Sequence, residues 1–564
     1  MNDLANSPMT TTSAPKRIDF NTPELQRKRR IRALKDHLTR WYVFIGGLAV
    51  LGAITLIFFF LGYVVYPLFQ GADLNAKQAI TPVWMQDAGK PLMISVEEQN
   101  QVGMRVSDKG MVLFFNAKNG EELSRVNLPL PAGTQVTSLG EDQPGNPVVV
   151  LGLSNGQALV FRHSYKVSYP DGKKTITPAI EYPYGETPIV LDPQGGALDH
   201  VNLSVNDSTL VLAGSSGAQL NVLSLAREEN MMTDEVTNTE TRIDLPQMTK
   251  QVKALYIDPR QQWLYVINDR AQADVFSLRD KSLNGRYKLV DDATTEITAS
   301  TQLVGGISLI FGDSKGGLSQ WFMARDPDGE QRFKHIRSFQ MGTSPIVEIT
   351  AEQRRKGFLA LDAAGEIGVF HSTAHRTLLV EKVAEGPGIM ALSPRANRII
   401  VEEGGKLLPL TLKNPHPEVS WSALWSKVWY ENYDEPKYVW QSTAANTDFE
   451  PKMSLAPLTF GTLKAAFYAM LLAAPLAVAA AIYTAYFMAP SLRRKVKPVI
   501  ELMEAMPTVI LGFFAGLFLA PYVEGHLPGI FSLLMLLPIG ILVAGFTFSR
   551  LPESIRLKVP DGWE

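Results

Sequence analysis

Apolar residues gather into a few long runs, and between these runs lies a long section in which apolar and polar residues alternate over short distances. Residues 41–69, WYVFIGGLAVLGAITLIFFFLGYVVYPLF, hold no charge and exceed the roughly 20 residues that a helix needs to cross a bilayer. Further runs cover residues 459–488, 498–521 and 529–548. The pattern predicts a multi-pass α-helical membrane protein with transmembrane helices in these four runs.

Charge next to the runs predicts their orientation. Residues 1–40 form a basic tail, with nine Lys or Arg against three Asp or Glu between Lys16 and Arg40. By the positive-inside rule this tail is cytoplasmic and residues 71–455 are extracytoplasmic. A cleaved signal peptide would have a shorter apolar core. Four crossings return the end, residues 549–564, to the cytoplasm. The basic residues on the cytoplasmic side would be Arg493, Arg494, Lys495, Lys497, Arg550, Arg556 and Lys558.

The section from 71 to 455 consists of short strand-like stretches around Gly, Asn, Asp and Ser turns. The hairpins read GMRVSDKGMVLFFN, PVVVLGLSNGQALVFR, TLVLAGSSGAQLNVLSL, WLYVINDRAQADVFSL, ISLIFGDSKGGLSQWF, GFLALDAAGEIGVFH and RIIVEEGGKLLPLTL. Their turns fall near Gly110, Gly156, Gly217, Ala271, Gly316, Gly365 and Gly405. A repeat of roughly 40–60 residues built from strand pairs is typical of β-propellers. The sequence therefore predicts a large all-β extracytoplasmic domain, a seven-bladed β-propeller.

The amino-acid composition limits the kinds of partner, metal site and reaction that we expect for this chain. The 46% hydrophobic and 20% charged content fits a hybrid of soluble and membrane parts, and a net charge of −2 gives no reason to expect nucleic acid as a partner. Without cysteine the chain can form no disulfide and no thiolate metal site. The eight histidines form no ligand cluster, and no Walker-type phosphate loop occurs. We therefore expect no catalytic residues, no metal and no cofactor in this chain, and ATP hydrolysis only in a partner.

Two polar motifs favour structural interpretations. The stretch GDSKGG, residues 312–317, superficially resembles a phosphate loop, but a strand follows it and its sister turns share its place in the repeat, so we predict a hairpin turn. The charge run EQRRK, residues 352–356, is interpreted as solvated surface.

Tryptophans recur every four residues after the last hairpin, at Trp421, Trp425 and Trp429. This spacing predicts that they share one face of a helix near 420–440. An interfacial helix that leads back to the membrane is one interpretation, because tryptophan favours the boundary between water and lipid. A seam packed against the propeller is the other, and both stay open.

Glu501 and Glu504 open the run at 498–521, with Pro498 predicted in the first helical turn. Carboxylates at a helix start are favoured by the macrodipole and by the nearby basic residues, which is the structural interpretation. Glu504, however, is placed where an ionised side chain in a membrane needs a partner or a wet cavity. A role for both glutamates in the transport path or in gating is the alternative.

The same run carries features of a helix packed on protein. Pro507 is predicted to kink it, and broken membrane helices often line a cavity. Gly512 and Gly516 form a GxxxG pattern that would allow close helix packing. Together with the two glutamates, Pro507 is a candidate for the transport path or for gating.

The run APLTFGTLKAAFYAMLLAAPLAVAAAIYTAYF, followed by RRKVKPVIELMEAMPTVILGFFAGL, closely resembles the membrane domain of phosphate ABC-transporter permeases. The shared elements are a Gly-Thr-Leu entry at 461–463, Pro475, Ala-Ile-Tyr at 481–483, Lys-Pro at 497–498, Glu-Leu at 501–502, Pro-Thr-Val at 507–509 and Gly-Phe-Phe at 512–514. The long amino-terminal part looks like the enlarged first permease subunit found in some Gram-negative bacteria.

This resemblance implies a permease subunit of an ABC importer that moves inorganic phosphate across the bacterial inner membrane. Its implied partners are a second permease subunit, a cytoplasmic ATP-binding subunit dimer, a periplasmic phosphate-binding protein and the lipid bilayer. In that family a cytoplasmic coupling helix lies before the last two spans, whereas this sequence ends at VPDGWE without it. We therefore expect either a truncated chain or a divergent gene.

Two rival functions remain. A membrane-tethered propeller that acts as a scaffold or sensor without transport activity would use the ring alone, since propellers commonly serve protein contacts. An extracytoplasmic enzyme is less favoured, because the histidines form no ligand pattern.

Overall fold

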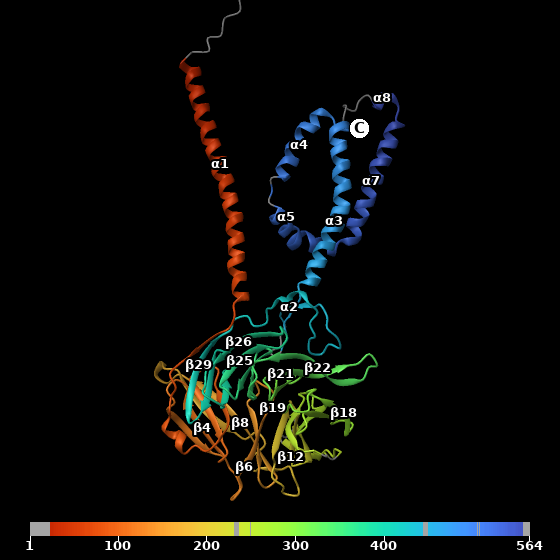
Figure 1. Cartoon of the computed structure of the whole chain (residues 1–564). Helices are drawn as coiled ribbons and strands as arrows, with labels where there is room; N and C mark the ends of the chain where they lie inside the picture. Colours follow the sequence, from red (N-terminus) through yellow and green to blue (C-terminus); the bar gives the residue numbers. More distant parts are fainter. Residues whose placement is uncertain are drawn as a thin grey trace, which may run out of the picture. The chain divides into compact units, whose positions relative to one another are not determined.

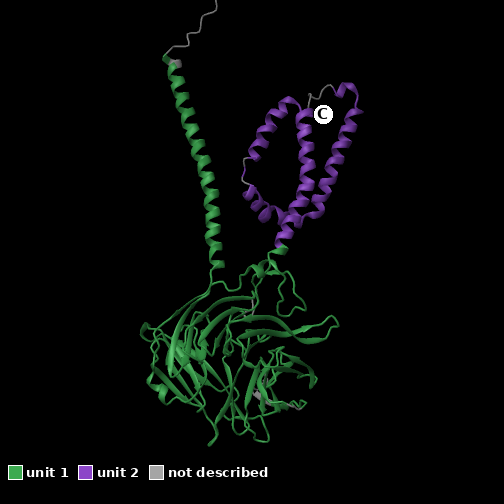
Figure 2. Ribbon diagram, in the orientation of Figure 1, with its two compact units in different colours: residues 1–457 green, residues 458–564 purple. Residues whose placement is uncertain are grey.

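The computed structural model describes residues 23–229, 236–246, 248, 250–443, 449–504, 506 and 508–556. The chain divides into two compact units, Met1–Pro457 and Leu458–Glu564, which are coloured separately in Figure 2. The first unit contains a long helix and the β-rich domain, and the second is helical (Figure 1).

Within the described residues the β-rich domain is a seven-bladed propeller, as predicted, with four or five antiparallel strands in each blade. The first three blades are β2–β5 (Pro91–Val96, Val102–Ser107, Met111–Asn116, Glu122–Asn127), β6–β10 (Val136–Glu141, Val148–Leu153, Gln157–Ser168, Thr175–Glu181, Ile189–Val190) and β11–β14 (His200–Val205, Thr209–Ser216, Gln219–Glu229, Val236–Arg242). The next three are β15–β18 (Val252–Ile257, Trp263–Asn268, Gln272–Ser277, Ser282–Lys288), β19–β22 (Ile297–Gln302, Leu309–Asp313, Gly317–Arg325, Gln331–Gln340) and β23–β26 (Ile346–Ala351, Gly357–Asp362, Glu366–His371, Arg376–Lys382). The last blade joins β27–β29 (Ile389–Leu392, Arg398–Glu403, Lys406–Lys413) to β1 (Asp73–Ala76).

The seven predicted hairpins are the two middle strands of the seven described blades. Each predicted turn residue has a positive φ, including Ala271 at 53°, and glycine adopts that region most cheaply. Gly365 shows why the small residue is needed: its φ is +82°, and a Cβ there would lie 2.1 Å from the carbonyl oxygen of Ala384. GDSKGG forms the turn between β20 and β21, as predicted.

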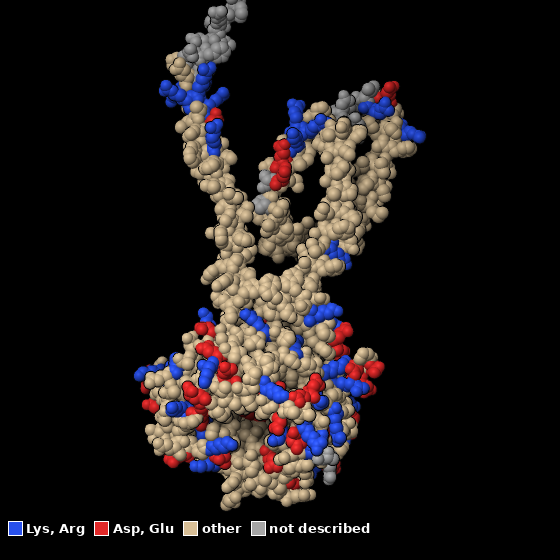
Figure 3. Space-filling model, in the orientation of Figure 1, with Lys and Arg blue, Asp and Glu red and all other residues tan. Residues whose placement is uncertain are grey.

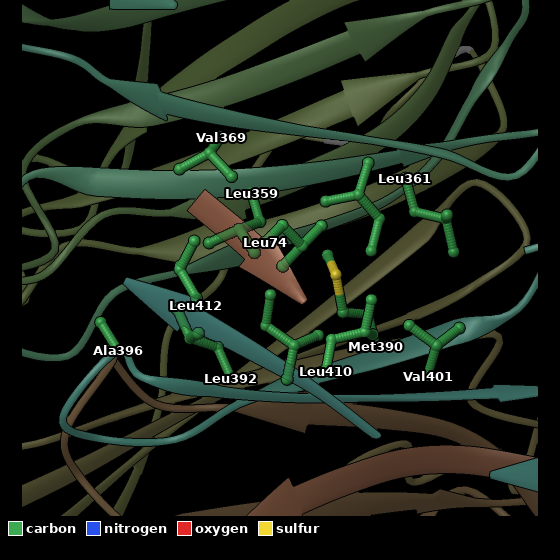
Figure 4. Close-up of a cluster of buried hydrophobic side chains, with 12 residues drawn as sticks. Leu74, Leu359, Leu361, Val369, Met390, Leu392, Ala396, Val401, Leu410 and Leu412 are labelled. Atoms are coloured by element: carbon green, nitrogen blue, oxygen red, sulfur yellow. The ribbon is translucent and has the colours of Figure 1, made fainter. Parts of the chain in front are cut away.

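The ring is closed by strands from opposite ends of the domain. β1 pairs antiparallel with β29, from Asp73 opposite Lys413 to Ala76 opposite Leu410. Leu74 of β1 is buried among apolar side chains of the last two blades, as Figure 4 shows. The labelled neighbours are Leu359, Leu361, Val369, Met390, Leu392, Ala396, Val401, Leu410 and Leu412. Closure therefore rests on ladder hydrogen bonds together with an apolar contact between blades.

The remaining elements of the first unit are α1 (Pro23–Val65), η1 (Tyr66–Phe69), η2 (Val83–Gln86), η3 (Pro170–Gly172), α2 (Trp421–Trp425), β30 (Trp440–Gln441) and β31 (Lys452–Met453). From α3 onward the elements are α3 (Ala456–Ile482), the π-helical turn η4 (Tyr483–Phe487), α4 (Pro490–Glu504), α5 (Thr508–Phe514), the π-helical turn η5 (Ala515–Leu519), α6 (Ala520–Gly525), α7 (Leu527–Ser549) and α8 (Glu553–Arg556).

In the described part of the chain, four helical segments are long and apolar enough to cross a membrane: Gln26–Phe69, Ala456–Phe487, Thr508–Gly525 and Leu527–Ser549. Their apolar side chains are exposed. In Figure 3 α1 is free of charged residues beyond its basic first part, whereas the propeller surface mixes both signs.

Two local predictions were wrong. Pro498 lies inside α4, which begins at Pro490, so Pro490 takes the favourable place for proline at a helix start. The helix predicted for all three tryptophans covers only Trp421–Trp425, because Ser420 caps its start and Ser426 is extended with ψ 163°. Trp429 therefore lies outside this helix and does not share its face.

Candidate functional site

The predicted transport-path residues belong to α4 and the segments after it. Glu501 and Glu504 lie on α4 together with the basic residues Arg493, Arg494, Lys495 and Lys497. The Lys497 ammonium is 3.8 Å from the Glu501 carboxylate, and both side chains are exposed. Among the described residues Glu504 has no ion pair, and Pro507 lies outside the described residues. The pairing of Glu501 agrees with the ion-pair part of the structural interpretation. The helix-start part is wrong, because both glutamates lie in the last turn of α4, which ends at Glu504. A role in gating stays a prediction for both.

Gly512 lies on α5 and Gly516 on the π-helical turn η5. A Cβ built at either glycine meets no heavy atom of the described chain within 4 Å. A π-helical turn widens the helix locally and often accompanies functional sites in other proteins. Close helix packing at these glycines stays a prediction, and it would need a neighbouring helix that the described residues do not place there.

The centre of the propeller holds two adjoining cavities, which together we call the tunnel. A cavity of about 500 Å³ and an adjoining one of about 360 Å³ are lined by β2, β6, β11, β15, β19, β23 and β27, the first strand of each described blade. Both cavities share Glu141 and Glu348 among their lining residues. The tunnel thus brings together carboxylates that are about 200 residues apart in the sequence.

A recurrent β-bulge aims the second glutamate. In five of the described blades the register between the first and second strands shifts after the first residue of the ladder. In β23 the shift lies between Ile346 and Glu348, and such a bulge turns the following side chain. Glu348 thereby lines the cavities.

Electrostatics in the tunnel favour protonated carboxyls. Burial among protein atoms raises the pKa of Glu348 to about 8, and repulsion from Glu141 adds to the rise. Burial raises the pKa of Glu141 to about 7 and also raises the pKa of Tyr256, whose hydroxyl donates to Ser300 Oγ at 2.8 Å.

A second polar cluster attaches the segment after the last blade to blades five and six. Lys356 Nζ is 2.5 Å from Glu431 Oε2, with side chains 1% and 5% exposed. Ser308 Oγ donates to the other oxygen of Glu431 at 2.6 Å. The Glu431 amide donates to Glu450 at 2.8 Å, and the Thr373 hydroxyl also donates to Glu450. We call these residues, with Arg337 and Gln320, the anchor cluster.

The anchor cluster balances its charges internally. The Arg337 guanidinium donates to Gln320 Oε1 at 2.7 Å and to the Trp429 carbonyl. Burial lowers the pKa of Arg337, and burial followed by repulsion from Glu431 raises the pKa of Glu450. Two cations and two carboxylates thus share one dry site, where losing one partner is costly.

Sequence reasoning missed this cluster. The run 352–356 is not wholly solvated surface, because Glu352 and Lys356 are each 1% exposed. Glu352 pairs with the neighbouring Arg355, whereas the carboxylate that pairs with Lys356 lies 75 residues further on, in a polar segment where no periodicity marks burial. In the described part of the chain no group of three or more His, Asp or Glu side chains could hold a metal ion.

Comparisons with known proteins agree with part of the sequence reasoning. No family model matches the chain. Over 121 residues, 20% of this chain and 39% of the relative, it is 35% identical to "Probable ABC transporter permease protein YqgH" of Bacillus subtilis (strain 168). The chain thus spans about two fifths of the length of this curated relative. One region of the chain is therefore similar to part of an ABC transporter permease.

Two solved structures are similar to about three fifths of this chain. The β-propeller domain of Myceliophteria thermophila Cps50 (Swd1) is 9% identical, with a TM-score of 0.40, and the match covers 60% of this chain and 99% of that one. Chaetomium thermophilum Raptor is 15% identical, with a TM-score of 0.41, and the match covers 61% of this chain and 29% of that one. At these TM-scores neither likeness adds to the fold described above.

Proposed function

We propose that this chain is a permease subunit of an ABC importer that moves inorganic phosphate across the bacterial inner membrane. The observation that carries the transport class is the 121-residue likeness to a probable ABC transporter permease. Phosphate as the cargo rests on the sequence motifs between Gly461 and Phe514 that resemble phosphate permeases.

In this proposal the amino terminus is cytoplasmic and the propeller faces the periplasm. The apolar segments cross the membrane as a multi-pass bundle. A second permease subunit completes the path, a dimer of cytoplasmic ATP-binding subunits hydrolyses ATP, and a periplasmic phosphate-binding protein delivers the ion. This chain carries out no covalent step, and binds no cofactor.

Glu504 is the stronger candidate for the transport path. Glu501 is balanced by Lys497 on the same helix, whereas an unpaired carboxylate near a membrane span calls for a partner or a wet cavity. Pro507 would help to open the helix there, and Gly512 and Gly516 would pack against a neighbouring helix.

Uptake of radiolabelled phosphate tests the proposal. A strain that lacks the gene should lose high-affinity phosphate uptake, keep sulfate uptake, and recover phosphate uptake when the gene is restored. E504Q should lower uptake several-fold at normal membrane abundance, and E501Q is the matched control with near-normal uptake. Near-normal uptake by both variants would remove Glu504 from the path.

Two observations favour the scaffold alternative. The propeller is a complete ring, and charges of both signs are spread over its surface (Figure 3). If deletion of the gene leaves uptake of both anions unchanged, a tethered scaffold or sensor becomes the better assignment.

A further inference from the structure

The two chain segments that enter and leave the propeller are held together. Arg376, the first residue of β26, donates to the Val419 carbonyl at 2.9 Å and to the Gln70 carbonyl at 3.4 Å. The ring of Phe69 stacks on Trp421 with centroids 5.5 Å apart. One side chain and one ring pair therefore join the end of η1 to the start of α2.

Large aromatic side chains are left exposed around this junction. Trp421 is 70% exposed and Trp425 45%, although both lie on a short helix whose Ala423 is buried. β31 packs against α2 and pairs with β30, which carries Trp440. We call the following exposed set the junction patch: Tyr66, Phe69, Trp421, Trp425, Tyr438 and Trp440.

Not every tryptophan of this segment belongs to the junction patch. Trp429 is held on the propeller, with its ring 6.2 Å from that of Phe322 and its indole N–H donating to the Tyr433 carbonyl at 2.8 Å. Each of the two interpretations left open by the sequence therefore fits different residues. Trp429 packs against the propeller, whereas Trp421 and Trp425 have faces without a partner in the described chain.

Along the sequence, the junction patch lies next to two segments that are apolar enough to cross a membrane. The first such segment ends at Phe69, and another begins at Ala456, one residue after Leu455, whose amide donates to the Leu424 carbonyl of α2. Trp and Tyr concentrate where lipid tails meet water, because their rings are apolar and carry one polar group. Lys427, whose ammonium lies 6.0 Å from the Tyr438 ring centre, adds a charge suited to lipid phosphates.

We propose that the junction patch is a lipid-binding surface that seats the propeller in the headgroup region of the outer leaflet, with Trp421 and Trp425 inserted. The occupant is phospholipid because the exposed rings continue directly from apolar helical segments. The inference rests on the membrane location in the proposed function but not on phosphate as the cargo.

Because the sequence contains no cysteine, a spin label can be attached at one chosen position by introducing a single cysteine there. Single cysteines are introduced into the full chain by S422C and S426C, both at exposed positions beside the tryptophans, and labelled with a nitroxide in phospholipid vesicles. A53C in α1 is the lipid-exposed control, and S282C on the outer strand β18 is the water-exposed control. Collision with oxygen reports lipid, and collision with a water-soluble nickel chelate reports water.

Labels at 422 and 426 should show a ratio of oxygen to nickel collisions several-fold above that at 282 and approaching that at 53. Adding W421A and W425A to the S422C chain should lower this ratio towards the value at 282. Water-like ratios at 422 and 426 with a lipid-like ratio at 53 would overturn the lipid assignment while leaving the membrane location intact. Labels shielded from both reagents would overturn it in favour of a protein contact, and a water-like ratio at 53 would overturn the membrane location itself.

Discussion

Replacing Lys356 with methionine tests the anchor cluster. The substitution keeps the length of the side chain but removes the ammonium that lies 2.5 Å from Glu431 and also donates to the Val304 carbonyl. Glu431 and Glu450 then face Arg337 alone, in a site where the carboxylates are at most 7% exposed. Removing one partner of a buried pair leaves a charge without compensation, which typically costs about 3–5 kcal/mol.

The expected thermal shift follows from the size of the domain. A unit of roughly 380 residues unfolds with an entropy of about 0.8 kcal/mol per degree, so the loss corresponds to roughly 4–6 °C in Tm. The full chain in detergent, followed by intrinsic fluorescence on heating, gives this number. Hydrogen exchange should also rise in peptides that contain Glu431 and Glu450, because the segment they anchor detaches first.

Two matched variants make the experiment decisive. K315M breaks the pair between Lys315 and Asp292, whose side chains are 55% and 51% exposed, so it should lower Tm far less than K356M does, because solvent screens an exposed pair. The double variant K356M/E431Q removes both charges and should lose less than the sum of the single variants. A K356M shift no larger than that of K315M, or strict additivity in the double variant, would refute the account of a buried, interdependent pair.

Two further predictions concern the tunnel and the hairpin turns. Because the pKa of Glu348 in the fold, about 8, lies above its ordinary value of 4.5, the fold favours the protonated acid, and stability is lost as pH rises from about 4.5 to about 8. E348Q should therefore flatten the decline of Tm between pH 5 and pH 9, and an unchanged pH profile would contradict this. G365A should destabilise the propeller more than G217A: both glycines have positive φ, but the added methyl group meets the Ala384 carbonyl in the first and open space in the second. Comparing the two melting temperatures isolates the steric contribution, and equal losses would show that backbone conformation alone sets the cost.

The propeller was predictable because its signal is local and repeated. Each hairpin joins alternating or continuous apolar stretches through a turn at positive φ, and those features lie within about fifteen residues. The fourth strand of the last blade was not predictable in this way. β1 pairs with β29 across more than 330 residues, and a four-residue strand carries no pattern that names its partner.

The misjudged residues share one cause, namely that tertiary contacts outweighed local pattern. Lys356 lies in a charge run that is typical of surface, and its burial is compensated by two distant groups, the Glu431 carboxylate and the Val304 carbonyl. The four-residue spacing of tryptophans favoured one helix, yet the packing of Trp429 on Phe322 holds that residue outside it. For the tunnel glutamates, the bulge that aims Glu348 leaves no mark in the sequence.

The closure of the ring by β1 and β29 has a mechanical consequence. The two strands are antiparallel, so the chain enters the ladder at Asp73 and leaves it at Lys413, side by side at the same end. A force that draws these two ends apart acts on one residue pair of the ladder at a time. The pairs then break one after another, which needs less force than breaking all of them together. The Arg376 hydrogen bonds to Gln70 and Val419 lie outside that end and bear the load first. Arg376 therefore resists the separation of the two ends before the closing ladder itself is loaded.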